Sequence, residues 1–123
     1  TDFGDMLATG YDGSGCSDGT RGIFTGYMDG GDNRIDEISY ITVGTPSNAT
    51  DFGNQSQIVS SPGCCSDGTT GFIMGGGTTG VFRNNIEYIT FSTLSNTADF
   101  GDLSVIKAGV GNGACGDSHG GLS

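Results

Sequence analysis

The residues of this chain best suited to chemistry are aspartates in glycine-rich segments. Asp29, Asp32 and Asp36 lie close together in the sequence, and Asp12 and Asp18 form a second group. Carboxylates, joined by backbone carbonyls from turns, are the hard oxygen ligands that Ca²⁺ takes. The spacing of an EF-hand loop is absent, and aspartates in turns commonly accept hydrogen bonds from their own backbone. The pattern therefore predicts turn-forming aspartates first, with a calcium site as the alternative.

Four cysteines are the second group of reactive residues. Cys16, Cys65 and Cys115 recur at nearly equal spacing, and Cys64 is additional. Equivalent strands of neighbouring repeats usually lie too far apart for a disulfide, which needs Cα atoms within about 7 Å. We therefore expect small buried thiols. The alternative is a disulfide that involves Cys64, for example as a vicinal pair with Cys65. A metal site is disfavoured, because His119 is the only histidine and no Cys-x-x-Cys spacing occurs.

Two further patterns have the residue types of a catalytic site without its context. Asp-Phe-Gly is a metal-binding triplet in kinases, but here no lysine-bearing strand, catalytic loop or phosphate loop accompanies it. His119 follows Asp117 and Ser118, whereas a triad requires groups that the fold brings together. The counterparts of His119 in the earlier repeats are threonines. The sequence therefore predicts no enzyme activity and no required cofactor.

Internal repetition gives these residues a structural interpretation. The Asp-Phe-Gly triplets are 49 and 48 residues apart, and two copies of Cys-Ser-Asp-Gly-Thr are 49 residues apart. In each repeat we expect the Phe to pack between units, the Asp to cap a turn and the Gly to adopt a special backbone angle. The three phenylalanines should then have like surroundings. The predicted repeat residues are Asp2, Phe3, Gly4, Asp51, Phe52, Gly53, Asp99, Phe100, Gly101, Tyr40, Tyr88, Cys16, Cys65 and Cys115.

Each unit has the composition of β structure. Residues 22–27 and 71–76 are short runs of apolar residues and glycine, and residues 35–43 and 86–93 are longer runs with a central tyrosine. Gly-rich and Asn-rich stretches between these runs are typical of turns. No segment combines a 3.6-residue apolar period with helix caps, so we expect almost no helix. The sequence predicts an all-β fold.

The order of these elements resembles the kelch repeat. The glycine pair corresponds to Gly75-Gly76, the tyrosine to Tyr40 and Tyr88, and the large aromatic residue to the phenylalanine of each Asp-Phe-Gly. The chain has no Trp, which kelch blades carry at the aromatic position. More closely, it resembles degenerate kelch-like repeats, rich in Asp-Phe-Gly-Asp and Cys-Ser-Asp, of bacteriophage and environmental bacterial proteins. This resemblance implies β-propeller blades and, by analogy, a role in an appendage or in host recognition.

The repeats do not add up to a closed propeller. The whole chain, 1–123, is predicted to be a single repeat domain. It comprises a half-unit 1–20, units 21–69 and 70–119, and the truncated start of another strand at 120–123. These are about two and a half units, whereas propellers usually have about four to eight blades. We therefore expect closure by further repeats of a longer chain or by other chains.

Composition narrows the possible partners. The net charge is −10, with only 4 Lys and Arg residues, which argues against nucleic acid and anionic membrane surfaces. No apolar run approaches the ~20 residues of a membrane span. We expect a non-enzymatic structural or binding module of a virion or extracellular surface, with contact loops at 28–34 and 77–84. Its partners would be further repeats, other copies, or a cell-surface glycan or protein. The alternative is a self-assembling subunit of an extracellular filament or ring.

Overall fold

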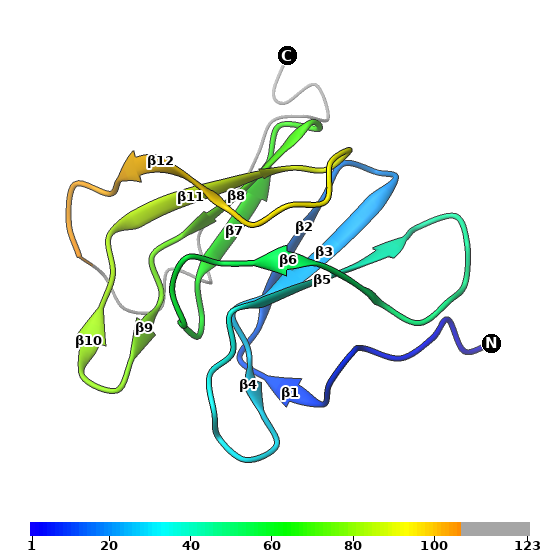
Figure 1. Ribbon diagram of the computed structural model, residues 1–123, viewed down its shortest axis with the longest axis horizontal. Helices are drawn as coiled ribbons and strands as arrows, with labels where there is room; N and C mark the ends of the chain where they lie inside the picture. Colours follow the sequence, from blue (N-terminus) through cyan, green and yellow to red (C-terminus); the bar gives the residue numbers. More distant parts are fainter. Residues whose placement is uncertain (107–123) are drawn as a thin grey trace.

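The computed structural model describes residues 1–106, and none of these residues is helical (Figure 1). The all-β prediction is confirmed for this part of the chain. The predicted strands 22–27, 35–43, 71–76 and 86–93 correspond to β3, β5, β8 and β11. The strands are β1 (Gly10–Tyr11), β2 (Ser14–Ser17), β3 (Arg21–Thr25), β4 (Met28–Asp29), β5 (Glu37–Thr42), β6 (Thr50–Asn54), β7 (Gly63–Ser66), β8 (Thr70–Met74), β9 (Gly77–Thr78), β10 (Val81–Phe82), β11 (Asn85–Thr90) and β12 (Ala98–Asp102).

Two four-stranded antiparallel sheets contain most of these strands. The first sheet has the order β2-β3-β5-β6, and the second has the order β7-β8-β11-β12. In each sheet the strands follow one another in chain order, so that every strand pairs with its sequence neighbour within the sheet. Two small sheets accompany them: β9 and β10 form a hairpin in the connection before β11, and β4, in the connection before β5, pairs with β1, which precedes the first large sheet.

The two large sheets repeat each other down to local irregularities. A β-bulge interrupts the third strand at Ile38/Ser39 in the first sheet and at Ile86/Glu87 in the second. The glycine opposite each bulge, Gly53 or Gly101, has a φ of 151° or 150°. Gly4 has a φ of 148°, although no large sheet of the described residues contains it. Such positive φ values favour glycine, which explains the glycine of each Asp-Phe-Gly.

The first strands of the two sheets, β2 and β7, lie side by side, and the sheets fan out from this line (Figure 1). Each sheet comprises residues 14–54 or 63–102, and the connection 55–62 crosses between them. The sheets therefore begin and end at other residues than the predicted units 21–69 and 70–119, although both repeat with the same period.

No helix among residues 1–106 is long and apolar enough to cross a membrane.

Candidate functional site: the seam between two repeats

The most elaborate site of the described chain is the interface between the two large sheets, which we call the seam. The first sheet contributes Ile23, Ile38 and Phe52, all nearly or fully buried. The second contributes Cys64, Ile73, Ile89 and Phe91, and Cys16 and Tyr40 pack at the margin of this cluster. The strand registers place these residues on one face of each sheet. Cys16, Ile23 and Tyr40 are cross-strand neighbours in the first sheet, and Cys64, Ile73 and Glu87 are cross-strand neighbours in the second.

Glycine permits the close approach of these faces. Gly71 on β8 is buried, and a Cβ there would lie 3.1 Å from the Phe91 ring and 3.2 Å from the Cys16 sulfur. Both contacts would be tighter than ordinary van der Waals contact, and the contact with Cys16 crosses the seam, so an alanine would force its neighbours to shift by a few tenths of an ångström. Close packing across the seam therefore favours glycine at position 71.

A backbone clamp joins the last strand of one repeat to a loop of the next. The backbone N–H of Asn54 donates to Asn96 Oδ1 at 3.0 Å, and the backbone N–H of Thr97 donates to the Asn54 carbonyl at 2.9 Å. Gly53 approaches this loop so closely that a Cβ would overlap the Ser95 carbonyl oxygen. The clamp therefore holds the β6 end against the β11–β12 loop through two reciprocal hydrogen bonds.

The same clamp occurs once more at the start of the described chain. The backbone N–H of Asp5 donates to Asn48 Oδ1 at 3.0 Å, and the backbone N–H of Ala49 donates to the Asp5 carbonyl at 2.8 Å. A Cβ on Gly4 would overlap the Ser47 carbonyl oxygen. Residues 2–5 thus bind the first sheet as 51–54 bind the second. Neither Asn48 nor Asn96 was predicted to lie at a junction, although Ser-Asn recurs at both positions.

A buried carboxylate closes the seam on one side. Glu87 is only 3% exposed, and its oxygens accept hydrogen bonds from the backbone N–H of Ser56 at 3.2 Å and from Thr97 Oγ1 at 2.6 Å. The Ser56 hydroxyl and the Asn85 amide also donate to Glu87. Ser56 belongs to the connection from the first sheet, so this network ties the two sheets together. Sequence reasoning missed Glu87, because its counterpart in the first sheet is Ser39.

Two more polar contacts cross the seam. Arg21 donates from Nη1 to the Phe91 carbonyl, and its guanidinium lies 5.1 Å from the centre of the Tyr40 ring. Ser66 Oγ donates to the Ser17 carbonyl at 2.6 Å, which joins equivalent positions of β7 and β2. These contacts satisfy the polar groups at the edges of an apolar interface.

The described cysteines at the seam act as packing residues. Cys16 and Cys64 are free thiols, and Cys64 is buried. The vicinal disulfide with Cys65 is not formed, because adjacent residues of β7 point to opposite faces of the sheet. A hydrogen bond to Cys64 and burial raise the pKa of the Cys16 thiol, which disfavours its thiolate form. The predicted Cys115 lies outside the described residues.

The three Asp-Phe-Gly copies have the same backbone angle at glycine, but their phenylalanines differ in burial. Phe52 is 3% exposed and its ring meets Tyr40 edge-on at 5.9 Å, whereas Phe3 is 38% and Phe100 is 62% exposed. The expected like surroundings are therefore found for the glycine angle and not for the phenylalanine. The physical reason is that, within residues 1–106, a second large sheet packs against Phe52 but not against Phe3 or Phe100. In the first triplet, Asp2 accepts a hydrogen bond from the Gly4 backbone N–H at 3.3 Å.

The loop aspartates form turns. Asp18 and Asp67 each accept two backbone N–H groups across the tight turn after β2 or β7, at 2.7–2.9 Å. Asp29 accepts the backbone N–H groups of Gly31 and Asn33 at 2.8 and 2.9 Å, and these bonds from Asn33 and Gly31 hold the Asp29 pKa below its ordinary value.

The calcium candidates Asp29, Asp32 and Asp36 have separate partners. Asp32 accepts from the Tyr11 hydroxyl, and this bond raises the Tyr11 pKa, while Asp36 accepts from the Asn54 amide at 3.1 Å. Residues 1–106 contain no group of three or more His, Cys, Asp or Glu side chains that could hold a metal ion. The structure thus assigns these aspartates, within its described part, to hydrogen bonds with the protein.

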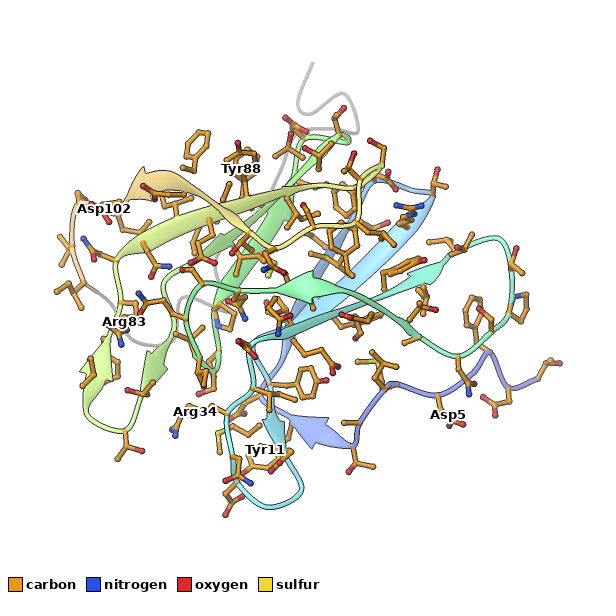
Figure 2. All side chains as sticks on the ribbon, in the orientation of Figure 1. Asp5, Tyr11, Arg34, Arg83, Tyr88 and Asp102 are labelled. Atoms are coloured by element: carbon orange, nitrogen blue, oxygen red, sulfur yellow. The ribbon has the colours of Figure 1, made fainter. Side chains whose placement is uncertain are left out.

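The predicted contact loops 28–34 and 77–84 lie at the same end of the molecule (Figure 1). Arg34 links them, since its Nε donates to Ser60 Oγ at 3.1 Å and its Nη1 donates to Thr79 Oγ1 at 3.2 Å. Figure 2 shows Arg34, Arg83 and Tyr11 at this end. Val81 and Phe82 are each 47% exposed at the β9–β10 hairpin. Arg83 follows Phe82 in the chain, and aromatic residues and arginine are enriched among the residues that anchor interfaces.

Comparison with known proteins adds no relative. No protein-family model matches the chain, and no curated protein matches it. His119, the tail 107–119 of the last unit and residues 120–123 lie outside the described residues. The site is thus characterised by its own geometry, which is a repeated, interlocking interface between β-sheets.

Proposed function

We propose that this chain is a non-enzymatic β-repeat module in which kelch-like blades stack on one another and present loops for attachment. The observation that carries the proposal is the seam. In the apolar core, the backbone clamp and the buried Glu87 network, residues that could take part in chemistry instead hold the two sheets together. Such a use of polar and thiol side chains is what we expect of a structural protein.

The contact surface of this scaffold would be the hairpin end, where loops 28–34 and 77–84 meet. Equivalent strands of the two repeats are alike, while these loops differ in sequence and length. Variable loops on a rigid framework are the usual location of binding residues. The net charge of −10 suits a soluble surface in a virion or extracellular setting, and a cell-surface glycan or protein would be the partner.

A binding assay with matched variants tests this role. The labelled 123-residue chain is applied to an array of bacterial surface polysaccharides and to whole bacterial cells. We expect binding that Phe82→Ser reduces about tenfold or more. Leu94→Ser, an equally exposed position in the β11–β12 loop, should leave binding unchanged. Binding to neither target, or equal loss in both variants, would contradict the proposal.

A further inference from the structure

Among residues 1–106, each large sheet has one face against which no other large sheet packs. The donor face is the outer side of the second sheet, with Phe72, Met74, Tyr88 and Phe100, and Phe100 meets Phe72 and Tyr88 edge-on at 5.1 and 6.2 Å. By the repeat, these four residues correspond to Ile23, Thr25, Tyr40 and Phe52 of the first sheet, which face the seam. The donor face is therefore a second copy of a surface that, in the first sheet, is covered.

The acceptor face is the outer side of the first sheet, with Phe24, Ile41 and Val43. It borders a cavity of about 680 Å³, which Met6 and Tyr11 also line. The counterparts of the acceptor residues are Ile73, Ile89 and Phe91, which receive the first sheet at the seam. The acceptor face is therefore a second copy of the receiving surface.

We propose that the donor face of one chain docks on the acceptor face of a second copy, head to tail, in the geometry of the seam. At the seam, the surface of the second sheet that corresponds to the acceptor face packs against the surface of the first sheet that corresponds to the donor face. Because each copy of the chain has both faces, a second copy is the partner that fits. Such a heterologous contact generates a ring or a filament. Figure 2 shows the equivalent residues Asp5 and Asp102 far apart on the molecule, as head-to-tail growth requires.

Residues 2–5 regulate this contact by competition. Their sequence, Asp-Phe-Gly-Asp, is identical to residues 99–102 of the donor face. They already occupy the clamp at Asn48, whereas a Cβ on Gly101 would meet nothing within 4 Å in the described part of the chain. For a second copy to complete the seam, its residues 99–102 must replace residues 2–5 of the acceptor chain. The segment 2–5 thus acts as an internal plug of the acceptor clamp.

Two matched substitutions test the competition. Gly4→Ala places a Cβ against the Ser47 carbonyl and releases the plug, so self-association should become about tenfold tighter. Gly101→Ala introduces the same backbone strain at a φ of 150°, but it should abolish association, because the new Cβ would overlap Ser47 of the second copy. Phe100→Ser should weaken association about thirtyfold. Sedimentation velocity of the full chain over a wide concentration range, at low and high salt, measures all four proteins.

The acidic chain should associate more tightly at high salt, because salt screens the repulsion between copies. Thermal unfolding of each variant confirms that it folds. A chain that is monomeric at every concentration, with Gly4→Ala included, would overturn the proposal, and so would equal effects of Gly4→Ala and Gly101→Ala. The inference rests on the stacking part of the proposed function alone. Because the Phe82 assay is independent of sedimentation, failure of attachment and failure of assembly can be distinguished.

Discussion

Phe52 and Phe100 occupy the same place in two copies of one motif, on the last strand of the first and the second sheet. Phe52 packs beneath a neighbouring sheet, and Phe100 is largely open to solvent. Each is opposed by a tyrosine, Tyr40 or Tyr88, so the local strand geometry is shared. The motif therefore supplies one half of an interface, which is a buried core where a neighbouring sheet packs against it, as at Phe52.

The largest expected difference comes from truncating these two phenylalanines. Phe52→Ala removes a buried ring and leaves a cavity, which should destabilise the protein by about 3–5 kcal/mol. Phe100→Ala removes an exposed ring with two edge-on neighbours, so it should cost about 1 kcal/mol. Denaturant unfolding of the monomer measures both variants. Equal losses of stability would show that the two sheets are not related in the way the seam implies.

Substitution of the neighbouring glycines, Gly53 and Gly101, should give a smaller difference in stability. Gly53→Ala combines strain at positive φ with overlap on the Ser95 carbonyl, for a loss of about 3 kcal/mol. Gly101→Ala has the strain without the overlap in the monomer, for a loss of about 1 kcal/mol. Thermal melts at low protein concentration, where copies are separate, give the comparison. A larger loss for Gly101→Ala would show that Gly101 is packed more closely than the described residues indicate.

Glu87 and Ser39 form the third pair. Glu87→Gln replaces an acceptor of several hydrogen bonds by an amide with one acceptor atom, and should cost about 2 kcal/mol. Ser39 Oγ is buried and has no hydrogen-bond partner among the described residues. Ser39→Ala should therefore be neutral or slightly stabilising. Denaturant midpoints at neutral pH test the pair, and a substantial loss for Ser39→Ala would show that its hydroxyl has a partner.

The smallest expected effect is on stability at acidic pH, through Asp67. Backbone N–H groups of Thr70 and Thr69 hold the pKa of Asp67 below its ordinary value. The folded protein thus favours the charged form, and this stabilisation is present above the ordinary aspartate pKa of about 4. It is lost as the pH falls through the lowered value. Asp67→Asn should flatten the acid limb of the melting-temperature profile, while the exposed Asp51→Asn on β6 is the control. An unchanged acid limb in Asp67→Asn would contradict this contribution.

The sequence was sufficient for the strands, the period and the turn role of aspartates such as Asp18, because these depend on local composition. It did not reveal where one sheet ends and the next begins, since a period of 49 residues is compatible with any starting point. The sheets break at 55–62, inside a predicted unit. The kelch-like identity of the sheets remains a prediction.

The seam itself was only partly visible in the sequence. Phe52 was expected to pack between repeats, and it does. Glu87 and Arg21 were not expected, because their counterparts, Ser39 and Thr70, cannot make the same contacts. Residues that occur once in a repeated chain carry no periodic signal, even where they join two repeats.

The clamp at Asn48 and Asn96 has a consequence for how such a chain can evolve. Asn48 and Asn96 lie in the β5–β6 and β11–β12 loops, at the ends of β5 and β11 away from the hairpins, and these loops, 43–49 and 91–97, have the same length. The connection before the third strand spans 26–36 in one repeat and 75–84 in the other, which is one residue shorter. Tandem duplication followed by insertion or deletion at that connection can therefore diversify the exposed loops while the joints between units keep their register.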